Sequence, residues 1–483
     1  MKKYYFSLII LLPLFFGSCG GSNSQDNEKV NQFVYDGMSN YYLWADGMKS
    51  KKPSDGDPKK YFDGLLNSTD KAQGWSFITD DIQSLVAEYA GTPKEFGFAL
   101  AGVRSDKSDE LYVIIKYVYP NSPAANAGLK RLDLITAIDG EAITEANTAK
   151  LFGSNKITLT KRTDGVTKNV DLTPAVITTN PVLHTSIHTY GSKKIGYIFY
   201  TSFISNYNES LFQAFNHFKQ EGVTDLVVDL RYNHGGAVTA AVYLASFIAP
   251  RNDVEAKKTY VKMNYNNYVN DIYDSSTSMS RIYQLGDYYQ PSKNPLNANL
   301  DLKNVYVIAT NDSYSASELI IHCLRPYMNV VHIGSNTGGK YTASWTIHAY
   351  DENYGMPLYK ESSLTKSDKD RLYNWAIQPI VAVYTDKDNK DFSAKGYLVP
   401  NSEIKEGFGF VSGWREIGDP QDVLLGEALY QITGDNSLKP TQPSGVAGIG
   451  GTQRSEDTML KLDNPKETKK RAVWIDNASI IRN

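Results

Sequence analysis

Three serines lie within five residues in the segment NDSYSASELII, which spans residues 311–321. The segment follows the strand-like run NVYVIAT and opens an apolar stretch with helical spacing, so we expect Ser315 at a helix N-terminus. Free backbone N–H groups and the positive end of the helix dipole gather there and favour a developing oxyanion. Ser315 followed by Glu318 also fits a capping box, and on the local sequence alone an ordinary helix cap is the commoner interpretation.

A lysine supplies a candidate base for this serine. Lys340 ends the segment VVHIGSNTGGK, 25 residues after Ser315, and the two glycines before it let the backbone turn. A partly buried lysine loses the solvation of its charged form, so its pKa falls and its neutral amine can accept a serine proton. None of the seven histidines has an acidic partner at hand in the sequence. The pair is therefore a candidate nucleophile and base for acyl transfer.

Several ordered motifs together resemble those of carboxy-terminal processing peptidases, also called tail-specific proteases. SASELI and IGSNTGGK resemble the serine and lysine motifs of the family, and DLRYNHGG resembles its glycine turn. The resemblance runs from Phe96 to about Gly434. It implies a serine endopeptidase that cleaves proteins or peptides near their C-termini.

The resemblance also implies a role for each matching residue. Ser315 would be the nucleophile and Lys340 the general base. The N–H of Ala316 and an N–H of the Gly235–Gly236 pair would form the oxyanion hole.

One position departs from the family pattern. Many members carry a glutamine four residues after the lysine, where this chain has Ser344, and a glycine directly after it, where this chain has Tyr341. Ser344 is thus a candidate orienter of the lysine amine. The departure also motivates an alternative, a catalytically idle binding protein that keeps the fold to hold peptides. A peptidase of related fold that trims short peptides is a further alternative.

A PDZ-like segment is predicted before the candidate dyad. Short alternating strands run from Phe96 to about Pro181. Residues 96 to about 178 resemble a PDZ domain, and SPAANAGLKRLDLITAIDG is close to the pattern of bacterial PDZ modules. EFGFAL resembles a carboxylate-binding loop, so backbone N–H groups around Gly97, Phe98 and Ala99 would hold the terminal carboxylate of a substrate. The peptide would then add as a strand beside FALAGV. Phe98 is also explained as an ordinary core residue.

The first residues predict export. MKKYYFSLIILLPLFFGSCGG has two lysines, an apolar run too short for a permanent membrane helix, and small residues before Cys19. FGSC resembles a bacterial lipobox, so we expect lipidation of Cys19 and a lipid anchor in a bacterial cell membrane, facing the periplasm or the surface. An ordinary signal peptide with a chance cysteine is the alternative.

The whole chain reads as a multi-domain protein with α/β and β parts. Strand, helix and strand after Pro181 predict a βαβ unit with a buried, partly parallel sheet, and the resemblance implies a ClpP/crotonase-like core with a mixed sheet. The predicted boundaries are: signal peptide 1–18, polar tether 19–29, N-terminal helical region 30–92, PDZ-like domain 93–180, catalytic core 181–434 and a C-terminal extension 435–483 of unassigned role.

The amino-acid composition limits the classes of partner that the chain is expected to bind. The net charge is -3, with 50 basic and 53 acidic residues, so no strong field favours nucleic acid. No cluster of His, Cys and acidic residues has ligand spacing, so neither a metal nor a cofactor is implied. Proteins or peptides as substrates, and a membrane through the lipid anchor, are the expected partners. Cys323 is expected to be a buried, inert thiol.

Overall fold

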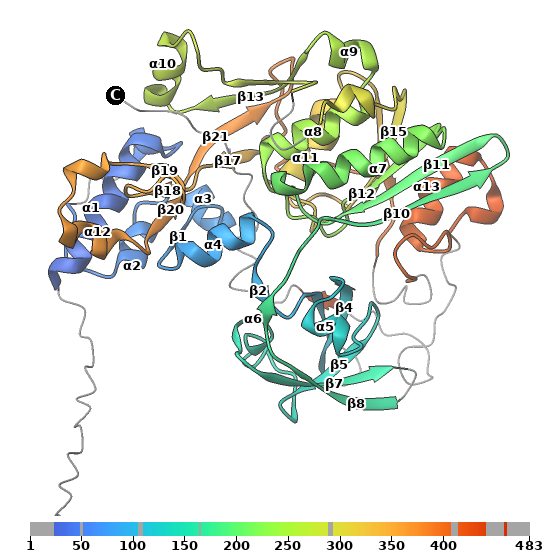
Figure 1. Cartoon of the computed structure of the whole chain (residues 1–483), viewed down its shortest axis with the longest axis horizontal. Helices are drawn as coiled ribbons and strands as arrows, with labels where there is room; N and C mark the ends of the chain where they lie inside the picture. The colour runs from blue at the N-terminus through green and yellow to red at the C-terminus, as the bar shows by residue number, and fades with distance from the viewer. Residues whose placement is uncertain are drawn as a thin grey trace, which may run out of the picture.

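The computed structural model describes residues 24–48, 52–104, 110–163, 166–287, 293–406, 414–440 and 458–460. Figure 1 shows a mainly helical N-terminal part, a PDZ-like β-domain and an α/β core. The predicted signal peptide 1–18 and Cys19 lie outside the described residues. Within the described ranges, no helix has both the length and the apolar character that a membrane span requires.

A mixed six-stranded sheet forms the centre of the core, as predicted. Its order is β10-β11-β12-β15-β16-β22, with β10 antiparallel to β11 and the remaining pairs parallel. The strands are β10 Val182–Tyr190, β11 Lys193–Tyr200, β12 Asp225–Asp229, β15 Asn304–Ala309, β16 Asn329–Gly334 and β22 Ser402–Glu403.

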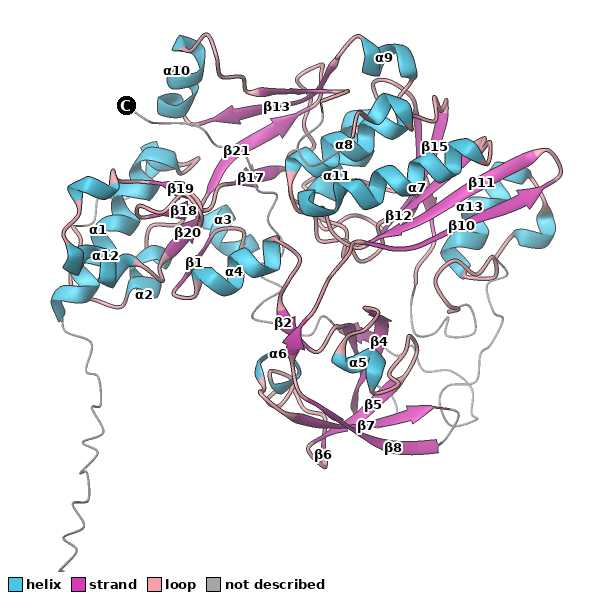
Figure 2. Cartoon of the chain, in the orientation of Figure 1, coloured by secondary structure: helices cyan, strands magenta, loops and turns pink. Residues whose placement is uncertain are grey.

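Helices cover both faces of this sheet (Figure 2). They are α7 Asn208–Gln220, α8 Val238–Ile248, α11 Ala316–Leu324 and α13 Val423–Thr433. Because side chains alternate along a strand, Ile198 and Tyr200 pack with α7, α8 and α11, whereas Tyr197 and Phe199 pack with α13. Every residue of α8 is buried, which explains why its sequence is apolar on most faces.

A second sheet continues from the segment after Lys340. Its order is β14-β13-β21-β17, and all pairs are antiparallel. The elements are α9 Arg251–Glu255, β13 Thr259–Tyr265, α10 Asn267–Ser275, β14 Ile282–Gln284, β17 Thr342–Ser344 and β21 Ile380–Thr385.

The N-terminal part is built jointly with residues late in the chain. Its helices are α1 Ser24–Tyr41, α2 Pro58–Asp63, α3 Ser68–Gln73 and α4 Ile82–Tyr89. Strand β1 Phe77–Thr79 pairs with β20 Ala376–Gln378, beside β18 Ile347–His348, β19 Met356–Pro357 and α12 Lys366–Leu372. Two features differ from the sequence prediction: α1 begins inside the segment 19–29 predicted as a tether, and the region 30–92 contains a strand.

The PDZ-like domain has its own sheet and core. The sheet order is β23-β3-β4-β5-β7-β8, with β6 beside β5, and β2 pairs separately with β9. Pro123 begins a short helix and Gly128 follows it with a positive φ, which is the usual placement of these two residue types. The elements are β2 Lys94–Glu95, β3 Phe98–Arg104, β4 Leu111–Val118, α5 Pro123–Asn126, β5 Leu134–Ile138, β6 Glu141–Ala142, α6 Lys150–Gly153, β7 Ile157–Thr163, β8 Val166–Leu172, β9 Ala175–Val176 and β23 Thr458–Leu460.

Candidate active site

Ser315 lies in a sharp turn between β15 and α11. It is the N-cap of α11, it is fully buried, and its backbone has φ 65° and ψ -110°. A positive φ is unfavourable for a residue with a side chain, and an ordinary serine cap has an extended backbone. Such strain persists where the surrounding structure enforces it, and it is typical of turns that present a nucleophile. The backbone conformation of Ser315 therefore differs from that of an ordinary serine helix cap.

Glu318 binds the backbones of both members of the candidate dyad. Its Oε2 accepts hydrogen bonds from the N–H of Ser315 at 2.6 Å and from the N–H of Lys340 at 2.8 Å. Its Oε1 accepts from the Thr337 hydroxyl at 2.5 Å and from the Gly339 N–H at 2.9 Å. Burial raises the pKa of this carboxyl group, and the four hydrogen bonds oppose that shift. One carboxylate thus brings together two residues that are 25 positions apart.

Tyr384, on β21, makes a second connection between the same two backbones. Its hydroxyl donates a hydrogen bond to the carbonyl oxygen of Lys340 at 2.8 Å and lies 3.4 Å from the carbonyl oxygen of Ser315. The tyrosine is fully buried, and burial, with Glu318 nearby, raises its pKa, so the hydroxyl stays protonated and donates. No sequence pattern points to Tyr384, because it lies in an ordinary apolar strand.

The two glycines before Lys340 are required by close approach. The Gly338 N–H donates to the Ser313 carbonyl at 2.9 Å, and a Cβ at Gly338 would lie 2.1 Å from the ring of Tyr314. Gly339 has φ 85°, and a Cβ there would lie 2.1 Å from the Gly396 carbonyl oxygen. The segment can therefore pack directly against the turn that carries Ser315. Lys340 itself is fully buried.

The glycine turn after β12 contacts the turn that carries Ser315. A Cβ at Gly235, where φ is 101°, would lie 2.9 Å from Ser315 Cβ and 3.1 Å from the backbone nitrogen of Ala316. The predicted oxyanion residues are thus neighbours. The Gly235 N–H, however, donates to the side-chain oxygen of Asn233 at 2.8 Å, which leaves the Gly236 N–H as the better candidate of the pair.

Asn233 and the two other serines hold these turns together. Asn233 donates through its side chain to the Tyr200 carbonyl at 2.8 Å, and its own carbonyl accepts from the Ser317 hydroxyl at 2.8 Å. The Ser313 hydroxyl donates to the Leu230 carbonyl at 2.7 Å. Ser313 and Ser317 therefore attach the turn that carries Ser315 to the residues that follow β12. Asn233 was not predicted, although its place in the DLRYNHGG motif was a signal.

Ser344 has a buried glutamine as its neighbour. The Gln378 amide nitrogen donates to Ser344 Oγ at 3.0 Å, and the Gln378 amide oxygen accepts from the Thr346 hydroxyl at 2.6 Å. Gln378 is fully buried on β20, a strand distant in sequence from Lys340. A glutamine is thus present beside position 344, although it is absent from position 344 itself. The role of Ser344 as a lysine orienter stays a prediction.

A groove of about 300 Å³ lies between the PDZ-like domain and the core. Gly97, Phe98 and Ala99 line it on the PDZ side, and Ser202 and His234 line it on the core side. His234 directly precedes the glycine turn, so the groove connects the predicted carboxylate loop with the surroundings of Ser315.

Gly97 and Phe98, which belong to the predicted carboxylate-binding loop, differ in how strictly the structure requires their residue type. A Cβ at Gly97, where φ is 88°, would lie 2.2 Å from Ser122 Cβ, so only glycine fits. Phe98 packs partly buried against the PDZ core and stacks on Phe96 at a ring distance of 5.7 Å, which agrees with the core interpretation.

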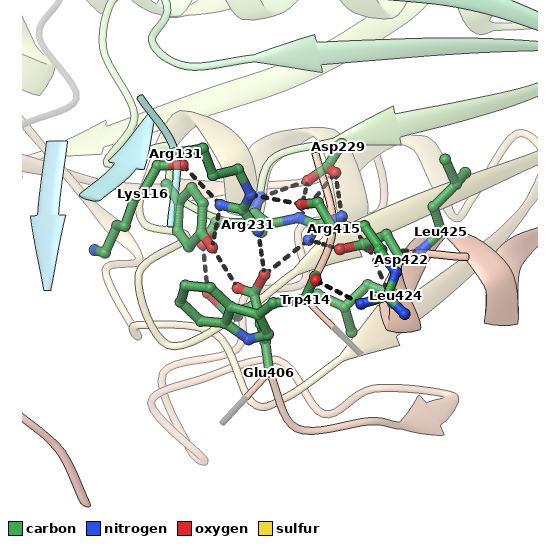
Figure 3. Close-up of polar contacts among 12 residues, drawn as sticks. Lys116, Arg131, Asp229, Arg231, Glu406, Trp414, Arg415, Asp422, Leu424 and Leu425 are labelled. Atoms are coloured by element: carbon green, nitrogen blue, oxygen red, sulfur yellow. Dashed lines mark hydrogen bonds and ion pairs between the residues drawn. The ribbon is translucent and has the colours of Figure 1, made fainter. Parts of the chain in front are cut away.

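A buried ionic cluster joins the PDZ-like domain to the core (Figure 3). Arg131, from the PDZ-like domain, donates to Glu406 at 3.1 Å. Arg231, from the DLRYNHGG motif, donates to the same Glu406 oxygen at 2.8 Å and pairs with Asp229 and Asp422 at 2.7 Å each. Although burial alone would lower the pKa of Arg231, the three carboxylates raise it overall.

A further ion pair joins the PDZ-like domain to the turn that carries Ser315. Lys116, on β4, contacts Asp312 at 2.7 Å, and its ammonium lies 4.9 Å from the ring centroid of Tyr232. Asp312 precedes Ser315 by three residues. The PDZ-like domain is therefore in direct contact with the turn that carries Ser315, through Asp312, and with the segment before the glycine turn, through Tyr232.

Cys323 lies inside α11 and is fully buried, and burial raises the pKa of its thiol well above the ordinary value. Its burial is as predicted, and its lack of reactivity stays a prediction that the raised pKa favours. Within the ranges that the structure describes, no group of three or more His, Cys, Asp or Glu residues is arranged to hold a metal ion.

Proteins similar to this chain include two relatives with curated descriptions and one protein of solved structure. A "Probable CtpA-like serine protease" of Staphylococcus aureus (strain N315) is 24% identical over 378 residues, which cover 76% of this chain and 67% of that protein. The "C-terminal processing peptidase, chloroplastic" of Tetradesmus obliquus is 26% identical over 160 residues, 29% of this chain and 34% of that protein. A crystal structure of a "Putative S41 protease" from Bacteroides fragilis NCTC 9343 has 25% identity and a TM-score of 0.64, covering 83% of this chain and 97% of that one.

Family models agree with the division seen in the fold. Residues 194–396 match Peptidase family S41, residues 29–77 match the Peptidase S41 N-terminal domain, and residues 114–152 match a PDZ domain. The chain thus carries the peptidase domain of family S41, together with the N-terminal domain of that family and a PDZ domain.

Proposed function

We propose that this chain is a serine endopeptidase that cleaves proteins or peptides near their C-termini with a Ser315–Lys340 dyad. The observation that carries the proposal is the Glu318 carboxylate, which accepts the backbone N–H groups of both residues. A structural capping box needs only the first of these bonds. Holding a buried lysine beside a strained serine is costly for stability, and catalysis explains why the cost is met.

The proposed reaction is acyl transfer. Ser315 Oγ attacks the peptide carbonyl carbon while the Lys340 amine, in its neutral form, takes the hydroxyl proton, since burial disfavours the charged form of a lysine. The N–H groups of Ala316 and Gly236 stabilise the oxyanion, and the lysine returns the proton to the leaving amine. Water then hydrolyses the acyl-enzyme by the same route. Each oxyanion donor is worth about 3 kcal/mol in the transition state.

Substrate recruitment is assigned to the PDZ domain. The terminal carboxylate of a peptide would bind the N–H groups near Gly97, Phe98 and Ala99, and the peptide would add to β3. The groove between this loop and the glycine turn supports the assignment, because it leads from the docking loop toward Ser315.

Ser344, which accepts a hydrogen bond from Gln378, is proposed to orient the amine of Lys340.

We also propose that Cys19 is lipidated and anchors the exported protein in a bacterial membrane. Replacement of Cys19 by alanine should then move the protein from the membrane fraction to the soluble fraction, as measured by immunoblotting.

The test compares the wild type with Ser315→Ala and Lys340→Met on reduced, carboxymethylated casein. We expect both variants to lose at least about a thousandfold in rate, because the nucleophile and its base act as a unit. Lys193→Met, on the exposed part of β11, is the matched control and should cleave like the wild type. If all of the proteins cleave alike, the dyad assignment is wrong.

The alternative, an idle peptide-binding protein, has its own signature. It predicts that a C-terminal peptide binds the wild type, that no cleavage follows, and that a serine-reactive phosphonate does not label Ser315.

A further inference from the structure

The C-terminal extension contributes a strand to the PDZ sheet. Strand β23 pairs antiparallel with β3, with Thr458 opposite Arg104, Met459 opposite Val103 and Leu460 opposite Gly102. The other neighbour of β3 is β4, so β23 occupies the outer edge of the sheet. This is the same edge to which a bound peptide would add.

The direction of β23 matches that of a bound peptide. β3 begins at Phe98, directly after the loop that holds Gly97. A peptide with its carboxylate at that loop must end where β3 begins, so it has to run antiparallel to β3. β23 runs in this direction too, from Arg104 toward the loop. The chain therefore pairs with its own PDZ edge in the orientation of a ligand.

A peptide bound at the carboxylate loop and strand β23 would cover different parts of the β3 edge. Phe98, Ala99 and Leu100 line the groove, whereas β23 covers Gly102 to Arg104. Since paired strands advance at the same rise per residue, the open part of β3 accommodates about four ligand residues. The fifth and earlier residues of a longer peptide would meet β23.

We propose that residues 458–460 are a tethered self-ligand that competes with the upstream residues of C-terminal peptides at the β3 edge. The inference rests on the proposed function, because it takes peptide addition to β3 as the mode of recruitment. A free three-residue strand would bind weakly, since each hydrogen bond contributes only about 1 kcal/mol. Attachment to the same chain raises its effective concentration to the order of millimolar. The preceding sequence, TQPSGVAGIGGTQRSED, has the composition of a linker.

Binding of two peptides to catalytically silent proteins tests the competition. All proteins carry Ser315→Ala, and the full chain is compared with a chain that ends at Pro440. A twelve-residue peptide and a four-residue peptide share the same last four residues. We expect truncation to tighten binding of the longer peptide about two- to tenfold, from the effective concentration of the tether, and to leave the shorter one unchanged. Fluorescence anisotropy measures both, the shorter by competition.

A point variant with a matched control avoids deletion of the whole extension. Met459→Pro with Leu460→Pro removes two backbone N–H groups from β23 and should act like the truncation. The same double change at Gly450 and Gly451, before the strand, should act like the full chain.

Hydrogen exchange of Gly102, Val103 and Arg104 separates the inference from the proposed function. We expect at least one of these amides to exchange faster in the truncated chain. Equal exchange in both forms overturns the inference, and so does equal affinity for the longer peptide when both forms bind it. Faster exchange without binding of either peptide refutes the proposed recruitment, while the pairing of the tail with β3 stands.

Discussion

Glu318 is the residue on which the geometry of the candidate site depends most. It accepts hydrogen bonds from the backbone N–H groups of Ser315 and Lys340, so it fixes the positions of the two backbones relative to each other. Tyr384 also binds the backbone rather than the side chain, because its hydroxyl donates a hydrogen bond to the carbonyl oxygen of Lys340. We therefore regard Glu318 as a positioning residue rather than a catalytic one.

Glu318→Gln should lower kcat about a hundredfold with little change in KM. The amide keeps the size of the side chain but offers only one acceptor, so Lys340 and Ser315 shift relative to each other, and misplacement of about 1 Å costs this much. Steady-state kinetics on a peptide substrate measures the effect. Glu427→Gln is the matched control, because Glu427 is a buried, hydrogen-bonded glutamate on α13, away from Ser315. An unchanged kcat in Glu318→Gln would show that Glu318 is only a helix cap.

The sequence revealed the candidate pair but not what holds it. Ser315 and Lys340 lie in recognisable motifs, and the glycines before Lys340 indicate that the backbone there approaches neighbouring residues closely. The second role of Glu318 was hidden, because Ser-x-x-Glu is explained completely by local capping. Tyr384 and Gln378 lie in ordinary buried strands, and their contacts arise only from tertiary packing.

At the scale of elements, β16 carries a histidine into the core. His332 is fully buried, and its Nε2 lies 3.3 Å from the Ala309 carbonyl on β15. Burial lowers its pKa to about 4. The strand that leads to Lys340 therefore contains a group that stays neutral in the folded state well below its ordinary pKa.

Stability should consequently fall in mild acid. Between pH 6.5 and about 4, the unfolded chain binds a proton at His332 that the folded chain does not, so stability is full above this window and is lost as the pH falls through it. The total loss is about 3 kcal/mol. Urea unfolding at several pH values measures it, and His332→Gln should flatten the dependence. His217→Gln, at an exposed position of α7, should keep the slope of the wild type.

Element types were largely predictable, whereas one pairing was not. Strand, helix and strand after Pro181 follow from apolar runs and helical spacing, and they form the parallel part of the core sheet as expected. β1 has three residues without alternation, and its partner β20 lies about 300 positions later, a pairing that no local pattern encodes. The start of α1 was missed because its first residues are polar.

At the scale of the whole molecule, Arg131 joins two domains. Its guanidinium donates to Glu406, to the Tyr232 hydroxyl and to the carbonyls of Lys116 and Arg415. The PDZ domain and the core therefore share one buried polar network, which the separate sequence motifs did not reveal.

Arg131→Met should destabilise the chain by about 1–3 kcal/mol, because buried acceptors lose their donor. The decrease in the urea midpoint measures it. Arg162→Met, whose guanidinium lies 5.5 Å from the Tyr112 ring within the PDZ domain, is the matched control and should cost less than about 1 kcal/mol. Equal midpoints for the two variants would show that the network contributes little to joining the domains.

The pairing of β1 with β20 also sets an order of events during synthesis. Strand β1 is made early, but its partner leaves the ribosome about 300 residues later, which takes about 15 to 60 s at ordinary translation rates. Until then the edge of β1 and the apolar faces of the first helices have no sheet to join. The nascent chain thus carries β1 without its partner for most of its production, and pairing of β1 in the N-terminal domain has to wait until β20 has been made.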